Sequence, residues 1–245
     1  LVSGGAGNNV MDGGAGTDTA DYSAATGPTA IHLDAGVTTN GLGGSDTLTG
    51  FENAIGSAQS DSVYGNASDN RIRAGAGNNI VSGGGGSDTA DYSTATGNAF
   101  IHLNGGATSN GFGGTDTLTG MENAIGSAQN DTIIGNASVN ALFGGTGTDY
   151  MIALGGNDSL DGGTGAANTL QGGPGDDIYY LRAVGDTIVE FNGEGYDRVE
   201  VYAPVASVNL STYFVEELRH NSATGITVAG NGLDNIIIGN VGSDY

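Results

Sequence analysis

A nine-residue period runs through most of this chain and leaves little choice of fold. From Gly56 the sequence divides into "GSAQSDSVY", "GNASDNRIR", "AGAGNNIVS" and "GGGGSDTAD", and from Gly126 into "GSAQNDTII", "GNASVNALF", "GGTGTDYMI" and "ALGGNDSLD". Each unit has a six-residue loop that ends in Asp or Asn, followed by three residues with an apolar one in the middle. Three residues between loops leave no room for a helix, so the period predicts short strands joined by glycine-rich turns.

The middle residues of the three-residue segments are nearly all apolar. Side chains alternate between the two faces of a strand, so the middle residue points one way and its neighbours the other. We predict that these residues stack inward as the core: Met11, Ala20, Val63, Ile72, Val81, Ala90, Ile133, Leu142, Met151, Leu160, Leu170, Tyr179, Ile188 and Ile237. Two units then complete one coil, and successive coils pair as parallel strands. The predicted fold class is all-β, a parallel β-roll (β-solenoid).

A longer repeat is laid over the short one. The segment "TDTADYSAATGPTAIHLD", which starts at Thr17, returns as "SDTADYSTATGNAFIHLN" from Ser87, an offset of 70 residues. In each copy a longer excursion interrupts the nine-residue register, and its "AIHLD" or "FIHLN" predicts an extra strand. We expect residues 1–245 to form one continuous array, a piece of a longer protein. Its parts are the tandem copies 17–86 and 87–156, and a further roll over 157–245 that contains a third, weaker repeat.

The thin core of this roll requires another source of stability. One buried side chain for every nine ordered residues does not offset the conformational entropy that the backbone loses on folding. Glycine-rich loops can turn their carbonyls inward, and the closing Asp adds a carboxylate, which together are the hard oxygen ligands that calcium prefers. Loops about eighteen residues apart stack on the same edge of the roll, so two of them can share an ion. We therefore predict several bound Ca²⁺ ions.

The predicted calcium ligands are residues that close a loop. Twelve of the 27 acidic residues stand at that position, and Asn replaces Asp in six units. The acids include Asp197 and Asp244 near the C-terminal end. The candidate metal ligands are Asp18, Asp46, Asp61, Asn79, Asp88, Asp116, Asp131, Asn140, Asp149, Asp158, Asn168, Asp177 and Asp186.

The units resemble a known repeat family. "GGAGTDTAD", "GGGGSDTAD" and "GGTGTDYMI" match the Gly-Gly-x-Gly-x-Asp-x-apolar-x pattern of the calcium-binding repeats-in-toxin (RTX) proteins. The resemblance covers most of the chain. It implies a parallel β-roll that folds on binding calcium, after unfolded export by the one-step (type I) secretion system of Gram-negative bacteria. The expected location is extracellular or at the bacterial cell surface.

Charge and composition exclude several other classes of function. The chain has 27 acidic residues against five arginines and no lysine, which gives a formal net charge of -22. Nucleic acid and anionic membranes need a basic surface, so neither is an expected partner, and no apolar run is long enough for membrane insertion. The absence of cysteine excludes disulfides and thiol redox chemistry.

No constellation of residues predicts catalysis. His32 and His102 are the same residue of the duplicated unit, His220 lies far away in sequence, and no His-Glu-x-x-His pair is present to hold a catalytic zinc. Glu52 and Glu122 occupy equivalent "FEN" and "MEN" positions, where we expect a structural role.

Two functions from different classes remain open. The first is a non-enzymatic calcium-binding structural module of a surface layer, filament or adhesin, whose partners are calcium and other copies of itself or neighbouring surface proteins. The second is the export and folding module of a secreted enzyme or toxin (protease, lipase, epimerase or pore-former). Sequence on either side of this segment would distinguish them.

Overall fold

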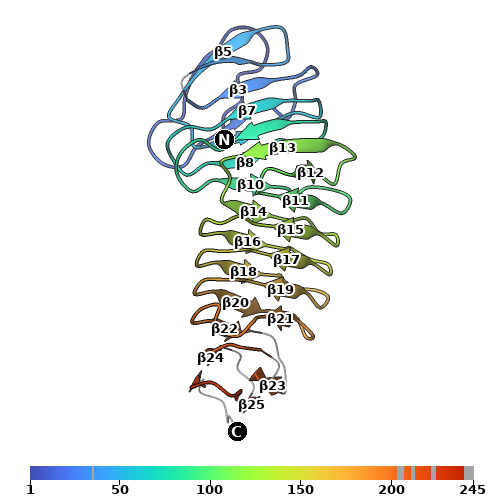
Figure 1. The fold of residues 1–245 in the computed structure, drawn as a ribbon. Helices are drawn as coiled ribbons and strands as arrows, with labels where there is room; N and C mark the ends of the chain where they lie inside the picture. Colours follow the sequence, from blue (N-terminus) through green and yellow to red (C-terminus); the bar gives the residue numbers. More distant parts are fainter. Residues whose placement is uncertain (35, 203–206, 211–212, 222–224, 240–245) are drawn as a thin grey trace. The chain divides into compact units, whose positions relative to one another are not determined.

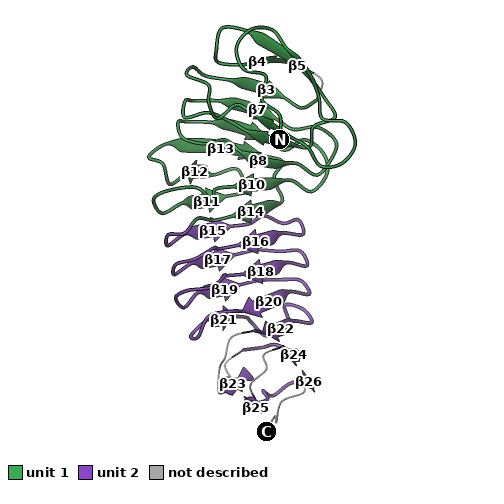
Figure 2. Cartoon of the chain, turned by 180° about the vertical axis from the view of Figure 1, so that it is seen from behind, with its two compact units in different colours: residues 1–127 green, residues 128–245 purple. Residues whose placement is uncertain are grey.

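The computed structural model describes residues 1–34, 36–202, 207–210, 213–221 and 225–239 of the chain. Its named elements are all β-strands, most of them three residues long, as the nine-residue period predicts. No helix in the described ranges is long and apolar enough to cross a membrane. The chain forms two compact units, residues 1–127 and residues 128–245 (Figure 2).

Unit 1 is built from two sheets that face each other across the core. The first has the strand order β1-β5-β4-β3-β7-β9-β13-β12-β11, and the second has the order β2-β6-β8-β10-β14. The strands of the first sheet are β1 (Val10–Asp12), β3 (Ala30–His32), β4 (Val37–Thr39), β5 (Ser45–Thr49), β7 (Ser62–Tyr64), β9 (Ile80–Ser82), β11 (Phe100–His102), β12 (Ala107–Ser109) and β13 (Thr115–Thr119). Those of the second are β2 (Thr19–Asp21), β6 (Asn53–Ile55), β8 (Arg71–Arg73), β10 (Thr89–Asp91) and β14 (Asn123–Ile125).

Unit 2 also has two main sheets, and its strands pair in parallel. One sheet has the order β15-β17-β19-β21, the other has the order β16-β18-β20-β22-β24-β26, and β23 pairs with β25 (Figure 1). The bounds are β15 (Thr132–Ile134), β16 (Ala141–Phe143), β17 (Tyr150–Ile152), β18 (Ser159–Asp161), β19 (Thr169–Gln171), β20 (Ile178–Leu181), β21 (Thr187–Val189), β22 (Arg198–Val201), β23 (Ser207–Asn209), β24 (Glu217–His220), β25 (Thr227–Ala229) and β26 (Ile236–Ile238).

Successive coils stack in parallel, with their middle residues in register. Val63 pairs with Val81 in unit 1, and Leu160 pairs with Tyr179 in unit 2. Thirteen of the fourteen predicted inward residues are buried, from Met11 at 6% exposed to Tyr179 at 0%. The prediction of a parallel β-roll is thereby confirmed.

Ile237 is the exception, and its prediction as a core residue is wrong. Its side chain is 47% exposed, and Ile236 and Ile238 beside it are also exposed. Its strand, β26, is the last in its sheet and pairs on one side only, with β24. A coil needs neighbours to bury its single apolar residue, and β26 lacks the second one in the part of the chain that is described.

The excursion of each 70-residue copy adds strands to the first sheet. "AIH" and "FIH" form β3 and β11, as predicted. The chain then turns back twice, so that β4 and β12 pair antiparallel with the strands on both sides. These antiparallel strands were not predicted. The turned-back segment is held by Asn40, whose Nδ2 donates to the carbonyl of Gly7 at 2.7 Å, and by Asn110, which donates in the same way to Gly77.

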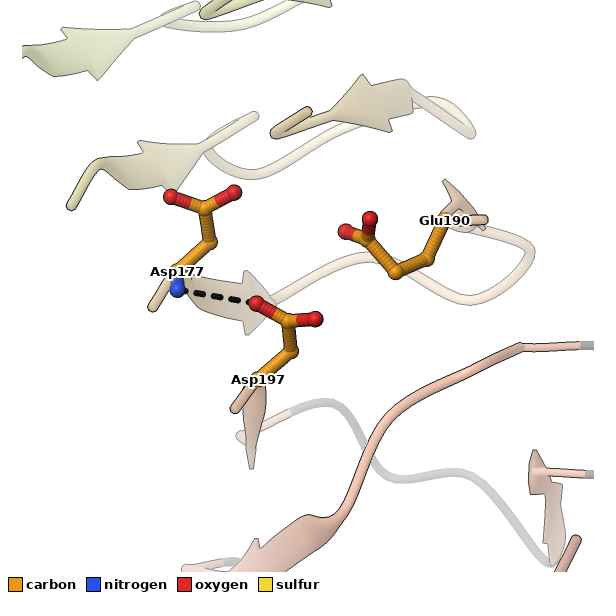
Figure 3. Close-up of side chains that lie close together, drawn as sticks. All are labelled: Asp177, Glu190 and Asp197. Carbon is orange, nitrogen blue, oxygen red and sulfur yellow. Dashed lines mark hydrogen bonds between the residues drawn. The ribbon is translucent and has the colours of Figure 1, made fainter. Parts of the chain in front are cut away.

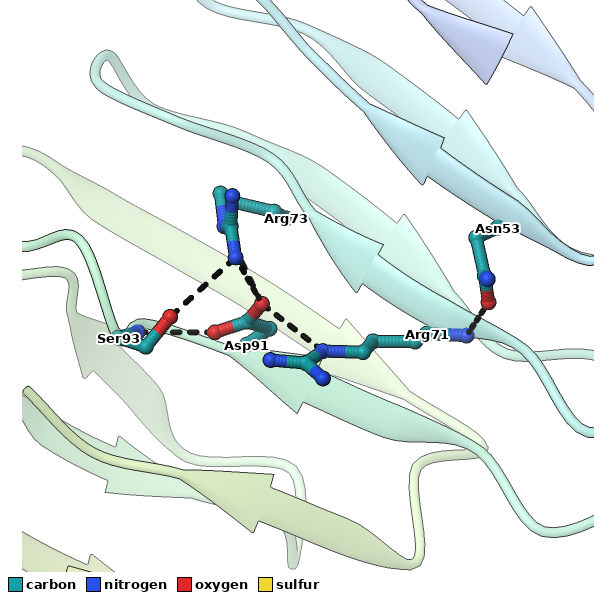
Figure 4. Close-up of polar contacts among 5 residues, drawn as sticks. All are labelled: Asn53, Arg71, Arg73, Asp91 and Ser93. Carbon is teal, nitrogen blue, oxygen red and sulfur yellow. Dashed lines mark hydrogen bonds and ion pairs between the residues drawn. The ribbon is translucent and has the colours of Figure 1, made fainter. Parts of the chain in front are cut away.

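Two of the five arginines lie together on the outer face of the second sheet of unit 1. Arg73 Nη2 is 2.6 Å from Asp91 Oδ2, and Arg71 Nε is 3.0 Å from the same oxygen (Figure 4). Asp91 is 3% exposed. Burial raises its pKa, but hydrogen bonds from Ser93 and the charges of the two arginines outweigh that effect and lower the pKa below its ordinary value. This aspartate is therefore neutralised within the protein.

The histidines occupy separate strands. His32 and His102 follow the buried Ile31 and Ile101, so their side chains alternate to the outer face, where the His32 ring stacks on Tyr64 with centroids 4.6 Å apart. His220, the last residue of β24, is instead a buried side chain, at 3% exposed.

Candidate metal-binding loops

The closing residues of successive coils are joined by a ladder of hydrogen bonds along each edge of the roll. In unit 2, on the edge before β16, β18, β20 and β22, each closing residue donates its backbone N–H to the side-chain oxygen of the closing residue one coil later. Asn140 donates to Asp158 Oδ1 at 2.7 Å, Asp158 to Asp177 Oδ1 at 2.7 Å, and Asp177 to Asp197 Oδ1 at 2.9 Å. The ladder places side by side the closing residues whose spacing predicted that they would be neighbours.

The opposite edge of unit 2 has the same ladder. Asp131 donates to Asp149 Oδ1 at 2.9 Å, Asp149 to Asn168 Oδ1 at 2.8 Å, and Asn168 to Asp186 Oδ1 at 2.9 Å. Each side-chain oxygen therefore fixes the position of the coil before it.

Unit 1 forms the same contacts across its irregular coils. Asp61 donates to Asn79 Oδ1 at 2.9 Å, and Asn79 donates to Asp116 Oδ1 at 3.0 Å although 37 residues separate the two. Asn70, on the other edge, donates to Asp88 Oδ1 at 2.7 Å. The excursion lengthens the chain between neighbouring coils without breaking the ladder.

Glutamates fill the ladder position after each excursion. The backbone N–H of Asp18 donates to Glu52 Oε2 at 2.8 Å, and that of Asp88 donates to Glu122 Oε2 at 2.9 Å. In unit 2 the N–H of Asp197 donates to Glu216 Oε2 at 2.8 Å. The predicted ligand set omitted these glutamates, although the "FEN" and "MEN" segments marked Glu52 and Glu122 as equivalent positions.

Five closing aspartates have an open carboxylate oxygen. In each, Oδ2 is buried without a hydrogen-bond partner in the described structure: Asp88, Asp149, Asp158, Asp177 and Asp197. None of the five side chains is more than 1% exposed. Glycine backbone lies against three of these oxygens, because a Cβ on Gly83, Gly144 or Gly172 would collide with Oδ2 of the aspartate five residues later.

The ionised form of these open carboxylates is unfavourable when no cation is bound. Burial raises the pKa of Asp88, Asp149, Asp158 and Asp197 to about 6 and that of Asp177 to about 7, although the ladder hydrogen bonds lower each pKa. Neighbouring carboxylates raise the pKa of Asp177 further. A buried anion without a partner is costly, and a bound cation removes that cost. The oxygen-only donor set and the glycine-lined space fit Ca²⁺.

Asp46 and Asp116 have partners on both oxygens. Asp46 Oδ1 accepts the N–H of Asn9 at 2.9 Å, and its Oδ2 accepts the hydroxyl of Tyr22 at 3.1 Å. Asp116, the equivalent residue of the second copy, accepts the hydroxyl of Tyr92 at 3.0 Å. These carboxylates bind the excursion to the roll.

Asp61 and Asp186 each have one oxygen satisfied by their own loop and the other by an earlier part of the chain. Asp61 Oδ2 accepts the N–H of Ser57 at 2.6 Å, and Asp61 Oδ1 accepts that of Thr29 at 2.7 Å. Asp186 Oδ2 accepts the N–H of Ala183 at 2.8 Å, while its Oδ1 is a ladder acceptor.

The side-chain amides of three closing asparagines donate hydrogen bonds to nearby side chains. Asn79 Nδ2 donates to Asp116 Oδ1 at 2.9 Å, and Asn168 Nδ2 donates to Asp186 Oδ1 at 3.0 Å. The amide of Asn140 donates to Asn136 Oδ1 at 3.0 Å.

Among the remaining candidate ligands, Asp18 is partly exposed and Asp131 is 2% exposed. Asp244 lies outside the described residues.

Comparisons with known proteins agree with this geometry. The family model described as "RTX calcium-binding nonapeptide repeat (4 copies)" matches residues 1–22 and 55–90. The model described as "Peptidase M10 serralysin C terminal" matches residues 78–236, more than half of the chain. Comparison with curated proteins gave no match. The resemblance to the RTX family is confirmed: the chain is a calcium-binding β-roll of the type I-secreted, extracellular class. It belongs to the family of the serralysin C-terminal domain, with RTX calcium-binding nonapeptide repeats.

Proposed function

We propose that this chain is an extracellular structural module that folds when calcium enters its loops. The ions would bind at the open carboxylates, and each would be shared by loops one coil apart. Export in the unfolded state would precede this step, because low cytosolic calcium leaves the carboxylates charged and unpaired.

The five buried Oδ2 atoms without a partner are the observation that carries this proposal. Metal binding supplies folding free energy when the site does not exist in the unfolded chain. Here each open carboxylate also accepts the ladder hydrogen bond that positions the preceding coil, so a bound ion and correct stacking favour each other.

Circular dichroism with a chelator and with calcium tests the proposal. We expect a largely disordered chain in chelator and a gain of β signal when calcium is added. Magnesium, and sodium chloride at equal ionic strength, are the controls, because screening of the -22 charge alone would act in either salt. Full β content in excess chelator would contradict calcium-dependent folding.

The tandem duplication favours a role as a building element at the cell surface. Repeated units with no unique constellation of residues fit a surface layer, filament or adhesin, whose contacts would be with other copies or with neighbouring surface proteins. Sedimentation velocity at increasing protein concentration, with and without calcium, would detect self-association of this kind.

The serralysin match favours a second candidate, the export and folding module of a secreted enzyme or toxin. The matched region is the non-catalytic C-terminal part of serralysin-like proteins. The adjoining coding sequence decides between the two candidates. A metalloprotease motif or a hydrolase nucleophile elbow would support the second, and further repeats on both sides would support the first.

In both candidates we expect this chain to have no catalytic activity of its own. The expectation rests on its acids and histidines, which stand at repeat positions or in isolation. Hydrolysis of a peptide, ester or glycan substrate by the purified chain, lost on a single substitution outside the loops, would contradict it.

A further inference from the structure

Two loop-closing aspartates of unit 2 meet a buried glutamate that does not belong to the nine-residue pattern. Asp177 precedes β20, Glu190 follows β21 and Asp197 precedes β22. One oxygen from each lies within 4.8 Å of the other two. The residues are 1%, 5% and 1% exposed, and Figure 3 shows the Glu190 carboxylate turned toward the two aspartates. The described residues contain no other group of three or more such ligands, and this one includes no histidine.

Glu190 stands where a regular loop has its first glycine. In the loop before β20, Gly172 precedes the closing Asp177 by five residues, and its backbone lies against that carboxylate. In the loop before β22, Glu190 precedes the closing Asp197 by seven residues. This loop is therefore two residues longer than the regular one. Glu190, its first residue, brings a third carboxylate into the space that Gly172 lines in the regular loop.

Tyr179 fixes the orientation of Glu190. Tyr179 is the fully buried second residue of β20, and its hydroxyl donates a hydrogen bond to Glu190 Oε2. The same hydroxyl accepts the backbone N–H of Gly172 at 2.8 Å. A tyrosine at this core position thus reaches the edge of the roll and holds the glutamate toward the aspartates.

The cluster brings three acidic groups together with no counterion among the described residues. Oδ2 of Asp177 and Oδ2 of Asp197 are buried without partners, and no ion pair among the described residues involves any of the three acids. The other acids that act on Asp177 and Asp197 add negative charge: Asp158, Asp176, Glu194 and Glu216. Convergent oxygen ligands with excess negative charge select a hard divalent cation.

We propose that Asp177, Glu190 and Asp197 form a three-carboxylate Ca²⁺ site that the nonapeptide pattern does not encode, with Tyr179 as its positioning residue. This inference rests on the proposed calcium-dependent function and adds a ligand to it. Ligand charge is a main determinant of calcium affinity, so the third carboxylate makes this the tightest site on its edge.

Calcium bound per chain, measured by equilibrium dialysis, tests the site. Glu190→Gln keeps an acceptor for Tyr179 and removes one charge, while Asp34→Asn removes one charge at an exposed position and serves as the control. At a free calcium concentration that fills the tight sites of the wild type, we expect Glu190→Gln to bind one ion fewer, because affinity at this site is weaker on the order of tenfold. Asp34→Asn should bind as the wild type does. Equal binding by Glu190→Gln and the wild type would overturn the proposal.

A measurement on the wild type covers the case in which Glu190→Gln does not fold. In crystals grown with terbium in place of calcium, anomalous scattering should place an ion between the three carboxylates. Ions at other loops with none at this position would overturn the three-carboxylate site and leave the proposed function standing. No ion at any loop would contradict the proposed function itself.

Discussion

The backbone N–H of Asp158 donates to Oδ1 of Asp177 at 2.7 Å, and Oδ2 of the same Asp177 is buried without a partner in the described structure. One carboxylate therefore fixes the register between coils with one oxygen, while its other oxygen stays without a donor. In Asp116, by contrast, both oxygens already accept hydrogen bonds. This difference between open and satisfied aspartates leads to the first prediction.

Asp158→Asn and Asp116→Asn should differ in how they affect calcium linkage. The slope of the unfolding free energy against log calcium concentration reports the ions bound on folding. Asp158→Asn removes an open oxygen and should lower this slope. Asp116→Asn should lower the free energy by about 1–3 kcal/mol at every calcium concentration and leave the slope unchanged. Urea unfolding at a series of calcium concentrations gives both quantities, and equal slopes for the two variants would refute the distinction.

Asp149→Ala should raise the calcium midpoint of folding more than Asn70→Ala does. Asp149 has an open Oδ2, and its ladder neighbour Asp131 is a second carboxylate on the same edge. Asn70 contributes hydrogen bonds without charge, including one from Nδ2 to the carbonyl of Glu52 at 2.7 Å. We therefore expect the tightest regular sites between about residues 126 and 180. A shift in the Asn70→Ala midpoint as large as that of Asp149→Ala would show that the ranking is wrong.

The regular coils were predictable because they depend on local spacing. Val81 and Leu160 are buried for the reason that the sequence suggests: each is the middle residue of a three-residue strand that pairs with its counterpart one period away. Ile237 has the same spacing but is exposed, because burial depends on a neighbouring coil as well as on the residue itself.

Contacts between residues that the nine-residue spacing does not relate could not be predicted. Tyr22 bonds to Asp46, 24 residues later, so the nonapeptide pattern marks Asp46 as a ligand without showing that its carboxylate already has a partner. Glu190 was missed for the opposite reason, because it occupies a position where the pattern requires glycine. In both cases a side chain from outside the nonapeptide pattern lies beside the closing aspartate.

Low pH should favour the fold when calcium is absent. The raised pKa values, about 6 for Asp88, Asp149, Asp158 and Asp197 and about 7 for Asp177, mean that the metal-free fold binds protons that the unfolded chain releases. Stability from this source is complete below the ordinary value of 3.8 and is lost as the pH rises through the folded values. In chelator, β content measured by circular dichroism should fall between about pH 5 and about pH 8. A rise over that range would contradict the prediction. Calcium should remove this dependence, because it binds the ionised carboxylates.

Tyr92→Phe should destabilise the excursion of the second copy. The Tyr92 hydroxyl donates to the buried Asp116 Oδ2 at 3.0 Å, and its removal leaves that oxygen unsatisfied. The expected loss is about 1–3 kcal/mol in saturating calcium, measured by urea unfolding. Tyr22→Phe repeats the change in the first copy, where Asp46 is the acceptor, and should give a similar loss. A loss in neither variant would mean that these aspartates do not depend on the tyrosine hydroxyl.

The four glycines at 83–86 meet two different requirements. Gly84 and Gly86 have φ values of 105° and 110°, a region that other residues rarely adopt. Gly83 and Gly85 have ordinary φ values but different surroundings. A Cβ on Gly83 would collide with the carbonyl oxygen of Gly120 and with Oδ2 of Asp88, whereas a Cβ on Gly85 would meet only the Cα of Ala67, at 3.9 Å.

Gly83→Ala and Gly85→Ala should therefore have opposite effects. Gly83→Ala forces backbone apart and displaces an open carboxylate, so we expect a loss of about 1–3 kcal/mol and weaker calcium binding. Gly85→Ala fits the space and reduces the entropy of the unfolded chain, so it should be neutral or stabilising by about 0.4–1 kcal/mol. Urea unfolding in saturating calcium gives both free energies, and dialysis gives the calcium bound. If the two variants lose the same stability, the close approach of Gly83 to Asp88 is not what requires glycine there. If Gly83→Ala is unstable but binds as much calcium as the wild type, Asp88 Oδ2 is not a ligand.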